Sequence, residues 1–364
     1  MSTLRGSSKR ISPMEFDRSP GPAADAGPAG PAAQPVATWQ TSLRQAVRSL
    51  DELLGMLGLS REELPGLDAT SSFPLLVPRE YVQRMEVGNP RDPLLAQVLP
   101  RAEENLQVDG FGLDAVGDGP SARLPGILHK YQSRALLIAT GLCAVHCRYC
   151  FRRHYPYEDS PASLAQWDES LRYLEENPQI DEVILSGGDP LSLGNAKLFG
   201  LLGRVASLSH VSRVRIHTRF PVMIPSRIDS DFLERLEAIA FGPEGKPVWI
   251  VLHVNHAREI DGPLVEVCQR LRRSGAILLN QAVLLRGVND TFDSQRDLCK
   301  GLADAGVVPY YLHQLDRVAG TAHFECDEQL GESIVARLRT ELSGYATPRF
   351  VREIAGEASK TVIL

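Results

Sequence analysis

Short, almost uniformly apolar runs alternate with amphipathic stretches along most of the chain. A uniformly apolar run predicts a strand buried on both faces, and an apolar stripe with helical spacing predicts a helix that packs on such a sheet. Strands are predicted at residues 135–139, 182–185, 213–217, 248–254, 276–284 and 307–312. Helices are predicted between them at residues 163–176, 195–207, 229–240, 263–274 and 291–305.

This alternation indicates an α/β fold with a parallel sheet. We predict a partial TIM-like barrel built from six βα units, with a helical extension at its N-terminus. A doubly wound sheet is the alternative architecture. Both folds place ligands at the carboxyl ends of their strands, so the expected position of the functional site is the same in either case.

The residues before the barrel fall into two parts. Residues 1–37 are rich in Ser, Pro, Gly and Ala and hold few large apolar side chains, so we predict a disordered tail. From Trp39 to Leu57 apolar residues recur at helical spacing, Gly58 predicts the end of a helix, and Ser60 predicts the start of another. The predicted domains are therefore a helical segment over 38–123, the barrel over 124–326 and a C-terminal segment over 327–364.

The composition narrows the class of protein without naming a chemistry. The chain has 364 residues and a formal net charge of −6, with 23% charged residues, which is typical of a globular enzyme and disfavours a nucleic-acid partner. We find no apolar run that would span a membrane and no secretory signal, so we expect a cytoplasmic protein without a membrane partner. Cys268, Cys299 and Cys326 are scattered and are expected to be buried thiols.

Three further cysteines stand together directly after the first predicted strand of the barrel. Cys143, Cys147 and Cys150 have the spacing C-x3-C-x2-C. This set gives a cubane of four irons three thiolate ligands and leaves one iron open, which is useful where a small molecule must bind to the metal. The alternative is a zinc ion held by the three cysteines and by His146 or His154, because Cys3His is a common zinc set.

Polar residues also stand at the ends of later strands. The second strand ends in Ser186-Gly187-Gly188-Asp189, where two glycines let a ligand approach the backbone closely. An ordinary tight turn is the alternative. His253 and Gln281 end the fourth and fifth strands, and either a ligand or water and a neighbouring loop could satisfy them. We carry both forward as candidate cofactor-binding residues.

Basic residues near both ends of the barrel complete the candidate site. Lys130, Tyr131 and Arg134 precede the first strand and are three potential phosphate donors. Lys360 stands among small residues, which let an aldehyde approach, and such a lysine is the usual anchor for pyridoxal phosphate. Taken alone, Lys360 reads as an exposed lysine of the tail. Arg152 could pair with a substrate carboxylate through two hydrogen bonds or lie in a solvated turn.

From about Trp39 to Lys360 the chain resembles the lysine 2,3-aminomutases, which belong to the radical S-adenosylmethionine superfamily and use pyridoxal phosphate. It resembles most the branch that serves the β-lysylation of elongation factor P. The resemblance rests on an ordered series of segments: Leu128–Tyr131, Cys143–Tyr157, Ser186–Leu191, Gln281–Asp290, Tyr310–Asp316 and Gly356–Lys360.

The resemblance implies three cofactors. A [4Fe–4S] cluster would be bound by Cys143, Cys147 and Cys150. S-adenosylmethionine would bind the open iron and lie against the segment from Ser186 to Asp189. Pyridoxal phosphate would be held by Lys360 as a Schiff base, with its phosphate and ring against Lys130, Tyr131 and Arg134. An external electron donor would reduce the cluster.

The resemblance also implies a substrate and a reaction. Arg152 would bind the carboxylate of lysine, and Asp316 and Glu353 would select its distal ammonium group. The second acid is an aspartate in the enzymes that act on free lysine. The expected reaction converts L-α-lysine to β-lysine through a 5′-deoxyadenosyl radical and feeds a ligase that modifies elongation factor P. We also expect a homodimer. The alternatives are an aminomutase for arginine or glutamate, a radical enzyme without pyridoxal phosphate, and a non-enzymatic zinc or iron–sulfur protein.

Overall fold

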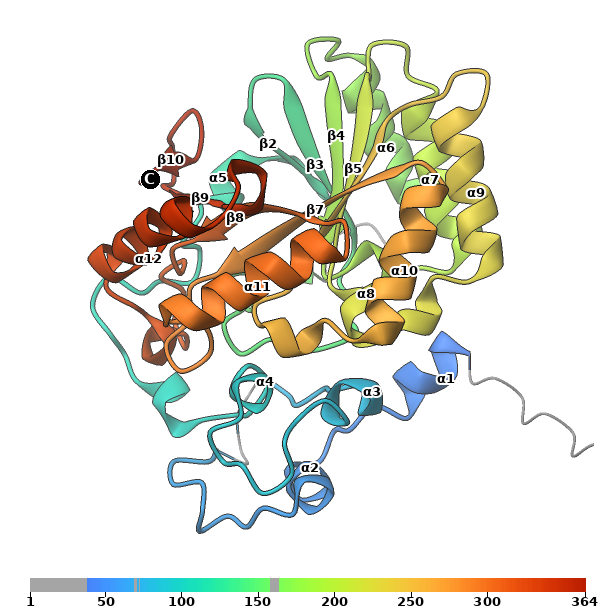
Figure 1. Ribbon diagram of the computed structural model, residues 1–364. Coiled ribbons are helices and arrows are strands. Elements are labelled where there is room, and N and C mark those ends of the chain that lie inside the picture. Colours follow the sequence, from blue (N-terminus) through green and yellow to red (C-terminus); the bar gives the residue numbers. More distant parts are fainter. Residues whose placement is uncertain (1–37, 69–70, 72, 158–163) are drawn as a thin grey trace, which may run out of the picture. The chain divides into compact units, whose positions relative to one another are not determined.

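The strands of the structure follow one another across the sheet in the order of the sequence. This computed structural model describes residues 38–68, 71, 73–157 and 164–364. The predicted disordered tail over residues 1–37 and the first residue of the helix predicted at 163–176 lie outside them. Within the described residues, ten strands form a single sheet, which Figure 1 shows curving around the centre of the molecule.

Neighbouring strands from β3 to β9 run parallel. They are β3 (Arg134–Thr140), β4 (Glu182–Gly187), β5 (Arg213–Thr218), β6 (Val248–Leu252), β7 (Ala276–Val283), β8 (Val308–His313) and β9 (Arg349–Arg352). Antiparallel strands extend both edges, namely β1 (Ala122–Leu124), β2 (Ile127–Tyr131) and β10 (Thr361–Val362).

Helices follow the parallel strands and cover the outside of the sheet (Figure 1). They are α6 (Leu164–Glu175), α7 (Asn195–Ala206), α9 (Ser230–Phe241), α10 (Gly262–Arg273), α11 (Phe292–Asp304) and α12 (Glu328–Glu341). Each of the six strands from β3 to β8 is thus followed by one of these helices in the described part of the chain. The predicted partial barrel of six βα units is confirmed.

The outer helices form where the sequence gives both an apolar stripe and a cap. In α10 the buried residues Leu264, Val267, Cys268 and Leu271 recur at helical spacing, and the Asp261 side chain accepts a hydrogen bond from a backbone N–H of the first turn. Cys268, Cys299 and Cys326 are free and buried, as predicted. They fill the core and take no part in the site.

Four strands of the sheet were not predicted, namely β1, β2, β9 and β10. Strand β9 follows β8 as a further parallel strand, and β2 carries Lys130 and Tyr131, which the sequence placed before the barrel. Both strands are short, and polar residues interrupt both: Lys130 and Tyr131 of β2 face the cavity, while Arg349 and Arg352 flank the buried Phe350 and Val351 of β9. Their role is to bring the two ends of the chain to the same cavity.

The N-terminal segment consists of short helices joined by turns. They are α1 (Trp39–Arg44), α2 (Leu50–Leu57), α3 (Arg79–Val82), α4 (Pro93–Ala96) and α5 (Asp118–Ser121). The left-handed Gly58 ends α2 as predicted. The helix predicted to start at Ser60 is wrong, because the residues after Ser60 form turns that lead to Pro65 and to Gly66 with a φ of +83°.

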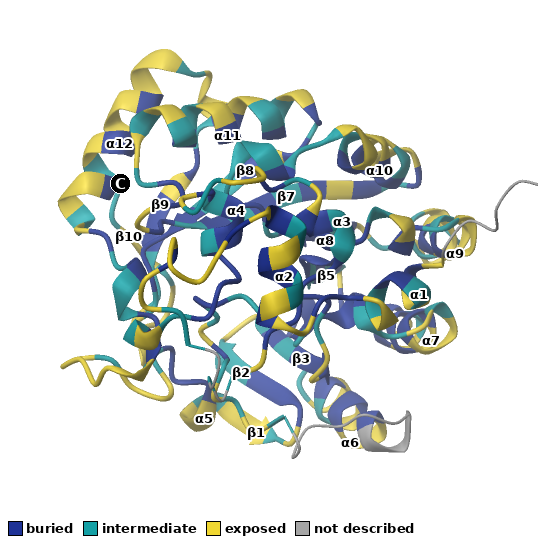
Figure 2. Cartoon of the chain, turned by 90° about the horizontal axis from the view of Figure 1, so that it is seen from below, coloured by how far each residue is buried: buried dark blue, intermediate teal, exposed yellow. Residues whose placement is uncertain are grey.

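This segment packs against the cysteine loop. The backbone N–H of His146 donates to the carbonyl of Leu76 over 3.0 Å, and that of Arg148 donates to the carbonyl of Gln97 over 2.9 Å. Figure 2 looks onto this side and shows α2 and α4 in front of the strands, with buried residues between them. The segment therefore covers the carboxyl ends of the strands near the predicted cluster.

Shorter helices complete the described elements. They are α8 (Phe220–Met223) and the 3-10 helices η1 (Ala102–Asn105), η3 (Pro190–Ser192), η4 (Pro225–Arg227), η5 (Ala257–Glu259), η6 (Ala322–Phe324) and η7 (Gly344–Ala346). In the described residues we find no helix with the length and apolar character needed to cross a membrane.

Candidate active site

A cavity of about 480 Å³ lies within the barrel, and all the site residues nominated from the sequence line it. They come from positions far apart in the chain and reach the cavity from β2, from the parallel strands and the loops that follow them, and from the C-terminal end. The full set is Lys130, Tyr131, Arg134, Cys143, Cys147, Cys150, Arg152, Ser186, Gly187, Gly188, Asp189, His253, Gln281, Asp316, Glu353 and Lys360.

The cysteine loop after β3 lies directly against the Gly-Gly turn after β4. A side chain at Gly187, which has a φ of +131°, would put its Cβ 2.3 Å from the carbonyl oxygen of Thr140. A Cβ at Gly188 would lie 2.4 Å from the carbonyl oxygen of Leu142. These distances are too short for any side chain, so the two glycines are required by the contact between the loops.

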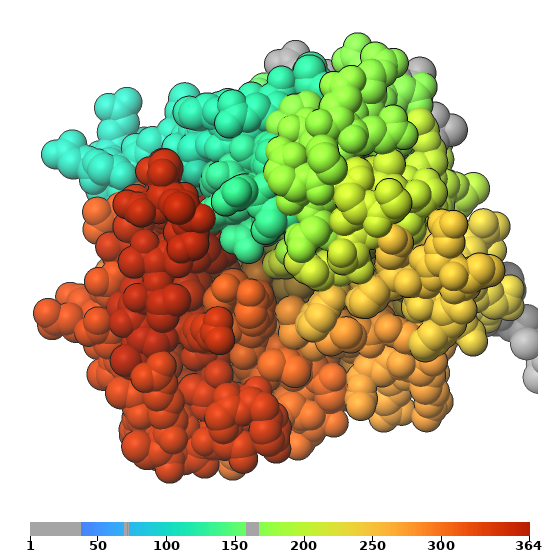
Figure 3. Space-filling view, turned by 90° about the horizontal axis from the view of Figure 1, so that it is seen from above, coloured from blue at the N-terminus to red at the C-terminus, as the bar shows by residue number. Residues whose placement is uncertain are grey.

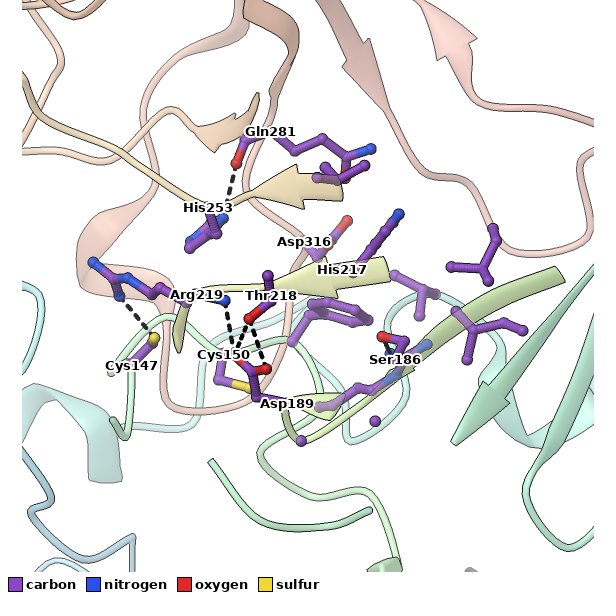
Figure 4. A pocket seen from close by; sticks show the side chains of 18 of the residues that line it. Cys147, Cys150, Ser186, Asp189, His217, Thr218, Arg219, His253, Gln281 and Asp316 are labelled. Carbon is purple, nitrogen blue, oxygen red and sulfur yellow. Dashed lines mark hydrogen bonds between the residues drawn. The ribbon is translucent and has the colours of Figure 1, made fainter. Parts of the chain in front are cut away.

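Asp189 fixes the same turn to the end of β5. Its buried carboxylate accepts hydrogen bonds from the Thr218 hydroxyl over 2.7 Å and from the backbone N–H groups of Leu191, Arg219 and Phe220. Figure 4 shows the bonds from Thr218 and Arg219. Burial raises the pKa of Asp189 to about 6 against these hydrogen bonds, which lower it. The Asp189 carboxylate is therefore hydrogen-bonded within the protein and positions the turn beside the cysteine loop.

The three thiols of the loop suit a cluster with three protein ligands. Burial raises the pKa of Cys150 to about 11, and the charge of Cys147 adds to this effect, so the thiolates need a cationic metal group to balance them. The histidines of the zinc alternative have other partners. His146 Nδ1 lies 2.8 Å from the carbonyl oxygen of Pro74, and His154 Nε2 lies 3.0 Å from that of Ala319.

A single metal ion needs its ligands close together, because zinc–sulfur bonds are only about 2.3 Å long. Over residues 38–68, 71, 73–157 and 164–364, no three His, Cys, Asp or Glu side chains are gathered in this way. The three thiols nevertheless line one cavity.

Arg219 is a residue of the site that the sequence did not single out. Its buried guanidinium donates to the sulfur of Cys147 over 2.8 Å and to the hydroxyl of Tyr149 over 2.6 Å. It also contacts Gln97 over 2.6 Å and Glu259 over 3.1 Å (Figure 4 shows the bond to Cys147). A cationic donor on a ligand sulfur stabilises added negative charge, so Arg219 is placed to ease reduction of a cluster bound there.

In the part of the chain that the structure describes, the side chain of His253 is hydrogen-bonded within the protein, whereas the side-chain nitrogen of Gln281 is not. His253 Nδ1 lies 2.8 Å from the backbone carbonyl oxygen of Gln281, and its Nε2 lies 2.9 Å from the hydroxyl of Tyr149. Burial and the nearby Arg219 lower the pKa of His253 to about 3, so this imidazole is neutral. The side-chain nitrogen of Gln281 is buried without a hydrogen-bond partner among the described residues.

Two further histidines line the cavity with polar atoms to spare. Nε2 of His217 on β5 and Nε2 of His313 on β8 are both buried, and the described part of the chain supplies no partner for either. Burial and the charge of Lys360 lower the pKa of both histidines. Together with Gln281 they present unsatisfied donors or acceptors to the cavity, which is expected of a site that holds a polar cofactor and substrate.

A chain of alternating charges leads from Arg152 to Lys360. Arg152 Nε donates to Asp118 over 2.7 Å, and Lys130 Nζ lies 3.7 Å from Asp118 and 3.2 Å from Glu353. Glu353 in turn pairs with Lys360. Asp118 was missed in the sequence because nothing in its short polar segment distinguishes it. These pairs keep three cations close together inside the barrel.

The predicted pyridoxal phosphate site fits these residues in part. Lys360 reaches the cavity, and Arg134 stacks 4.1 Å from the centre of the Tyr131 ring, so a basic group and an aromatic face lie near the amine. The ammonium of Lys130 is already paired with Glu353 and Asp118. Of the three predicted phosphate donors, Arg134 is therefore the best placed to bind a phosphate.

The partial barrel and the three-cysteine loop after its first parallel strand define an iron–sulfur enzyme of the radical S-adenosylmethionine class. A family model described as a 4Fe-4S single cluster domain matches residues 132–219, which include this loop. A solved radical SAM methyltransferase from Sphaerobacter thermophilus superposes with a TM-score of 0.41 at 16% identity, covering 62% of this chain and 68% of that chain.

Curated relatives are far more similar in sequence. The chain is 45% identical over 325 residues to L-lysine 2,3-aminomutase of Escherichia coli (strain K12), which covers 89% of this chain and 93% of that protein. It is 40% identical to L-lysine 2,3-aminomutase of Haemophilus influenzae, over 89% of this chain and 95% of that protein. The chain belongs to the lysine 2,3-aminomutase family, and the predicted family and enzyme class are confirmed.

Proposed function

We propose that the protein converts L-α-lysine to β-lysine by moving the amino group between neighbouring carbons. The observation that carries this proposal is the content of one cavity. The guanidinium of Arg152 is complementary to the carboxylate of lysine, and the carboxylate of Asp316 is complementary to its distal ammonium. The amine of Lys360 corresponds to the amino group that reacts. The names of the relatives support the same substrate.

Neighbouring side chains hold the guanidinium of Arg152 in position to bind a carboxylate. Its side chain is 8% exposed, with Nε bonded to Asp118 over 2.7 Å and Nη1 bonded to Ser186 over 3.1 Å. These two bonds fix the plane of the guanidinium and leave Nη2 for a ligand. A fixed guanidinium loses less conformational freedom when it binds a carboxylate.

The carboxylate of Asp316 is available to pair with a cation. In the described part of the structure its carboxylate accepts no hydrogen bond, although it lines the cavity. A glutamate substrate would bring a second carboxylate close to it, so the pocket disfavours glutamate. Arginine would have to place a larger planar cation in the same space.

The implied cofactors would supply the chemistry that side chains lack. The cluster held by Cys143, Cys147 and Cys150, with S-adenosylmethionine, would supply a 5′-deoxyadenosyl radical. Pyridoxal phosphate held by Lys360 would supply an aldehyde for the amino group and a ring that spreads unpaired spin. The surrounding residues would exclude water from these reactive species, which is the usual role of a closed barrel interior.

Turnover of amino acids by the reconstituted protein tests the proposal. After anaerobic loading with iron, sulfide and pyridoxal phosphate, we expect β-lysine to form from lysine only when S-adenosylmethionine and a reductant are present. Arginine and glutamate serve as matched substrates. Formation of a β-amino acid from either one, at a rate above that for lysine, would refute the substrate assignment.

The pH dependence of lysine binding is expected to follow Asp316. Burial raises the pKa of Asp316 to about 7, although the charge of Lys360 opposes this. Only the ionised carboxylate pairs with an ammonium group, so the KM for lysine should fall about tenfold between about pH 6 and pH 8. Steady-state kinetics would measure this change, and Asp316→Asn should raise the KM and remove the dependence. An unchanged profile in this variant would assign the titration to another group.

The same group affects the stability of the protein without substrate. The folded state holds the proton of Asp316 more firmly than the unfolded chain does, so stability is lost as the pH rises from about 4 to about 7. At pH 8 Asp316→Asn should therefore be more stable than the parent protein by roughly 2 kcal/mol, measured by denaturant unfolding.

We further propose that the β-lysine is passed to a ligase that attaches it to elongation factor P. The resemblance to that branch of the family, through the segments that contain Ser186 to Leu191 and Tyr310 to Asp316, supports this destination. An external electron donor would reduce the cluster, and a homodimer remains the proposed assembly.

A further inference from the structure

Strand β5 presents alternate side chains to the cavity. Arg215 and His217 line the cavity, whereas Val214 and Ile216 belong to the apolar core of the chain. Arg215 Nε donates a hydrogen bond to Glu182 over 2.9 Å. Nε2 of His217 is also buried, but no described residue is its hydrogen-bond partner. His217 therefore has a ring nitrogen left for a ligand.

The parallel register of the sheet brings His217 beside Ser186. Strands β4 and β5 pair Leu185 with Ile216, so the next pair in this register is Ser186 and His217. Paired residues of neighbouring strands lie about 4.8 Å apart. The hydroxyl of Ser186 accepts a hydrogen bond from Arg152 Nη1 over 3.1 Å, and Figure 4 shows Ser186 and His217 in the same part of the cavity. A carboxylate bound by Arg152 would therefore lie close to the imidazole of His217.

Lys360 approaches the same imidazole from the C-terminal end of the chain. Figure 3 shows the C-terminal residues, in red, beside the teal residues that lead into the sheet. Burial lowers the pKa of His217, and the charges of Arg215, Lys360 and Arg152 lower it further, as does the neighbouring His313. The imidazole of His217 is therefore neutral, and its unpaired nitrogen can accept a proton.

Other proton acceptors of the cavity are less well placed beside a carboxylate bound to Arg152. Asp118 accepts a hydrogen bond from Arg152 itself, and both ring nitrogens of His253 have partners within the protein. His313 also has an unpaired Nε2 among the described residues, but it belongs to β8. Arg152 is bonded to Ser186 of β4, the strand next to β5. The imidazole on β5 is thus closer to the guanidinium than the imidazole on β8.

Resting on the proposed function, we propose that His217 is a catalytic residue that moves protons between the α-amino group of the substrate and the amine of Lys360. In an α-amino acid the amino group and the carboxylate share one carbon, so a substrate held by Arg152 presents its α-ammonium to the neighbouring imidazole. The bound carboxylate also offsets the charge of Arg152. His217 therefore becomes a stronger base at the moment when the ammonium group arrives.

The exchange that His217 serves is balanced in atoms and charge. The substrate nitrogen uses its lone pair to form a bond to the aldehyde carbon of pyridoxal phosphate, and the nitrogen of Lys360 leaves that carbon with the electron pair of the bond that breaks. If the bond between nitrogen and cofactor is protonated before and after, the substrate nitrogen goes from three hydrogens to one, and the Lys360 nitrogen goes from one to three. His217 takes each proton from the first nitrogen and gives it to the second, so the imidazole ends neutral, as it began.

The test measures this exchange in the full-length protein loaded with pyridoxal phosphate, without S-adenosylmethionine or a reductant for the cluster, so that no radical forms. Lysine is added, and borohydride stops the reaction at set times and fixes the cofactor either on Lys360 or on the added lysine. Mass measurement gives the two fractions. We expect His217→Gln, whose amide can form hydrogen bonds but cannot carry a proton, to slow the exchange by about a hundredfold. The affinity for lysine at equilibrium should change by less than about threefold, because the variant alters the path between the two states.

Two further variants separate proton transfer from a structural role. His210→Gln is the matched control, since Nε2 of His210 is likewise buried without a partner in the described residues but His210 does not line the cavity. Its exchange rate should equal that of the parent protein. His217→Ala leaves space for imidazole from solution, and added imidazole should accelerate the exchange in this variant by at least about tenfold. An exchange rate in His217→Gln equal to that of the parent protein would overturn the proposal, and so would a slow His217→Ala protein that imidazole does not accelerate.

The exchange is complete before any isomerisation, so its outcome is separate from that of the proposed function. A parent protein that transfers the cofactor from Lys360 to lysine but forms no β-lysine would refute the proposed function and leave the comparison of exchange rates intact. A parent protein that forms β-lysine, together with a His217→Gln protein that exchanges at the same rate, would refute only the role assigned to His217.

Discussion

Cys147→Ala is expected to remove the cluster and to reduce lysine isomerisation by at least about a thousandfold. The remaining side chains cannot generate the radical that the reaction needs. The loop supplies three thiols, and losing one leaves two ligands for four irons. The sulfur of Cys147 is also the one that Arg219 contacts, so the variant leaves a buried guanidinium without this partner.

Iron and sulfide analysis, together with reductive cleavage of S-adenosylmethionine, would measure this loss. Cys299→Ala is the matched control, because Cys299 is a free cysteine buried in α11. It should keep its full iron content and lose about 1 kcal/mol of stability. A Cys147→Ala protein that still contains four irons per chain would show that the cluster is bound elsewhere.

Lys360→Ala is expected to abolish covalent capture of pyridoxal phosphate and to reduce isomerisation by on the order of a thousandfold or more. Lys360 is the lysine that β10 brings into the cavity and that pairs with Glu353. Reduction with borohydride followed by peptide mass measurement should find the cofactor on Lys360 in the parent protein and on no residue in the variant.

The two variants should fail in complementary ways. Lys360→Ala should still cleave S-adenosylmethionine, and Cys147→Ala should still capture pyridoxal phosphate. Lys300→Ala replaces an exposed lysine of α11 and serves as the control for Lys360→Ala. Full isomerase activity in Lys360→Ala would instead support a radical enzyme that does not use pyridoxal phosphate.

The sheet could be predicted only where its strands are apolar on both faces. Strand β4 is buried along its whole length, and the run from Glu182 to Leu185 identified it. Strand β2 was missed because His129, Lys130 and Tyr131 are polar or amphipathic and half-buried, which is the pattern of a loop. The parts of the sheet that carry the site are thus the parts that departed from the pattern.

Motifs in the sequence predicted which residues line the site. They did not predict which residues these side chains contact there. Lys360 and Cys143 are separated by more than half the chain, and only their resemblance to a family placed them together. Asp189 and His253 are both hydrogen-bonded to other parts of the protein, which the sequence could not show. Arg219 and Asp118 were not nominated because the sequence does not show which acid or sulfur a basic residue will meet.

Arg219 joins segments that are otherwise distant, and this links maturation of the protein to its folding. Its guanidinium touches Gln97 of the N-terminal segment, Cys147 and Tyr149 of the cysteine loop, and Glu259 after β6. A cluster bound through Cys147 would fix the sulfur that Arg219 contacts, and with it the cation that contacts Gln97. We therefore expect iron delivery to add to the free energy that keeps the N-terminal helices in place, and the metal-free chain to be cut faster by a protease.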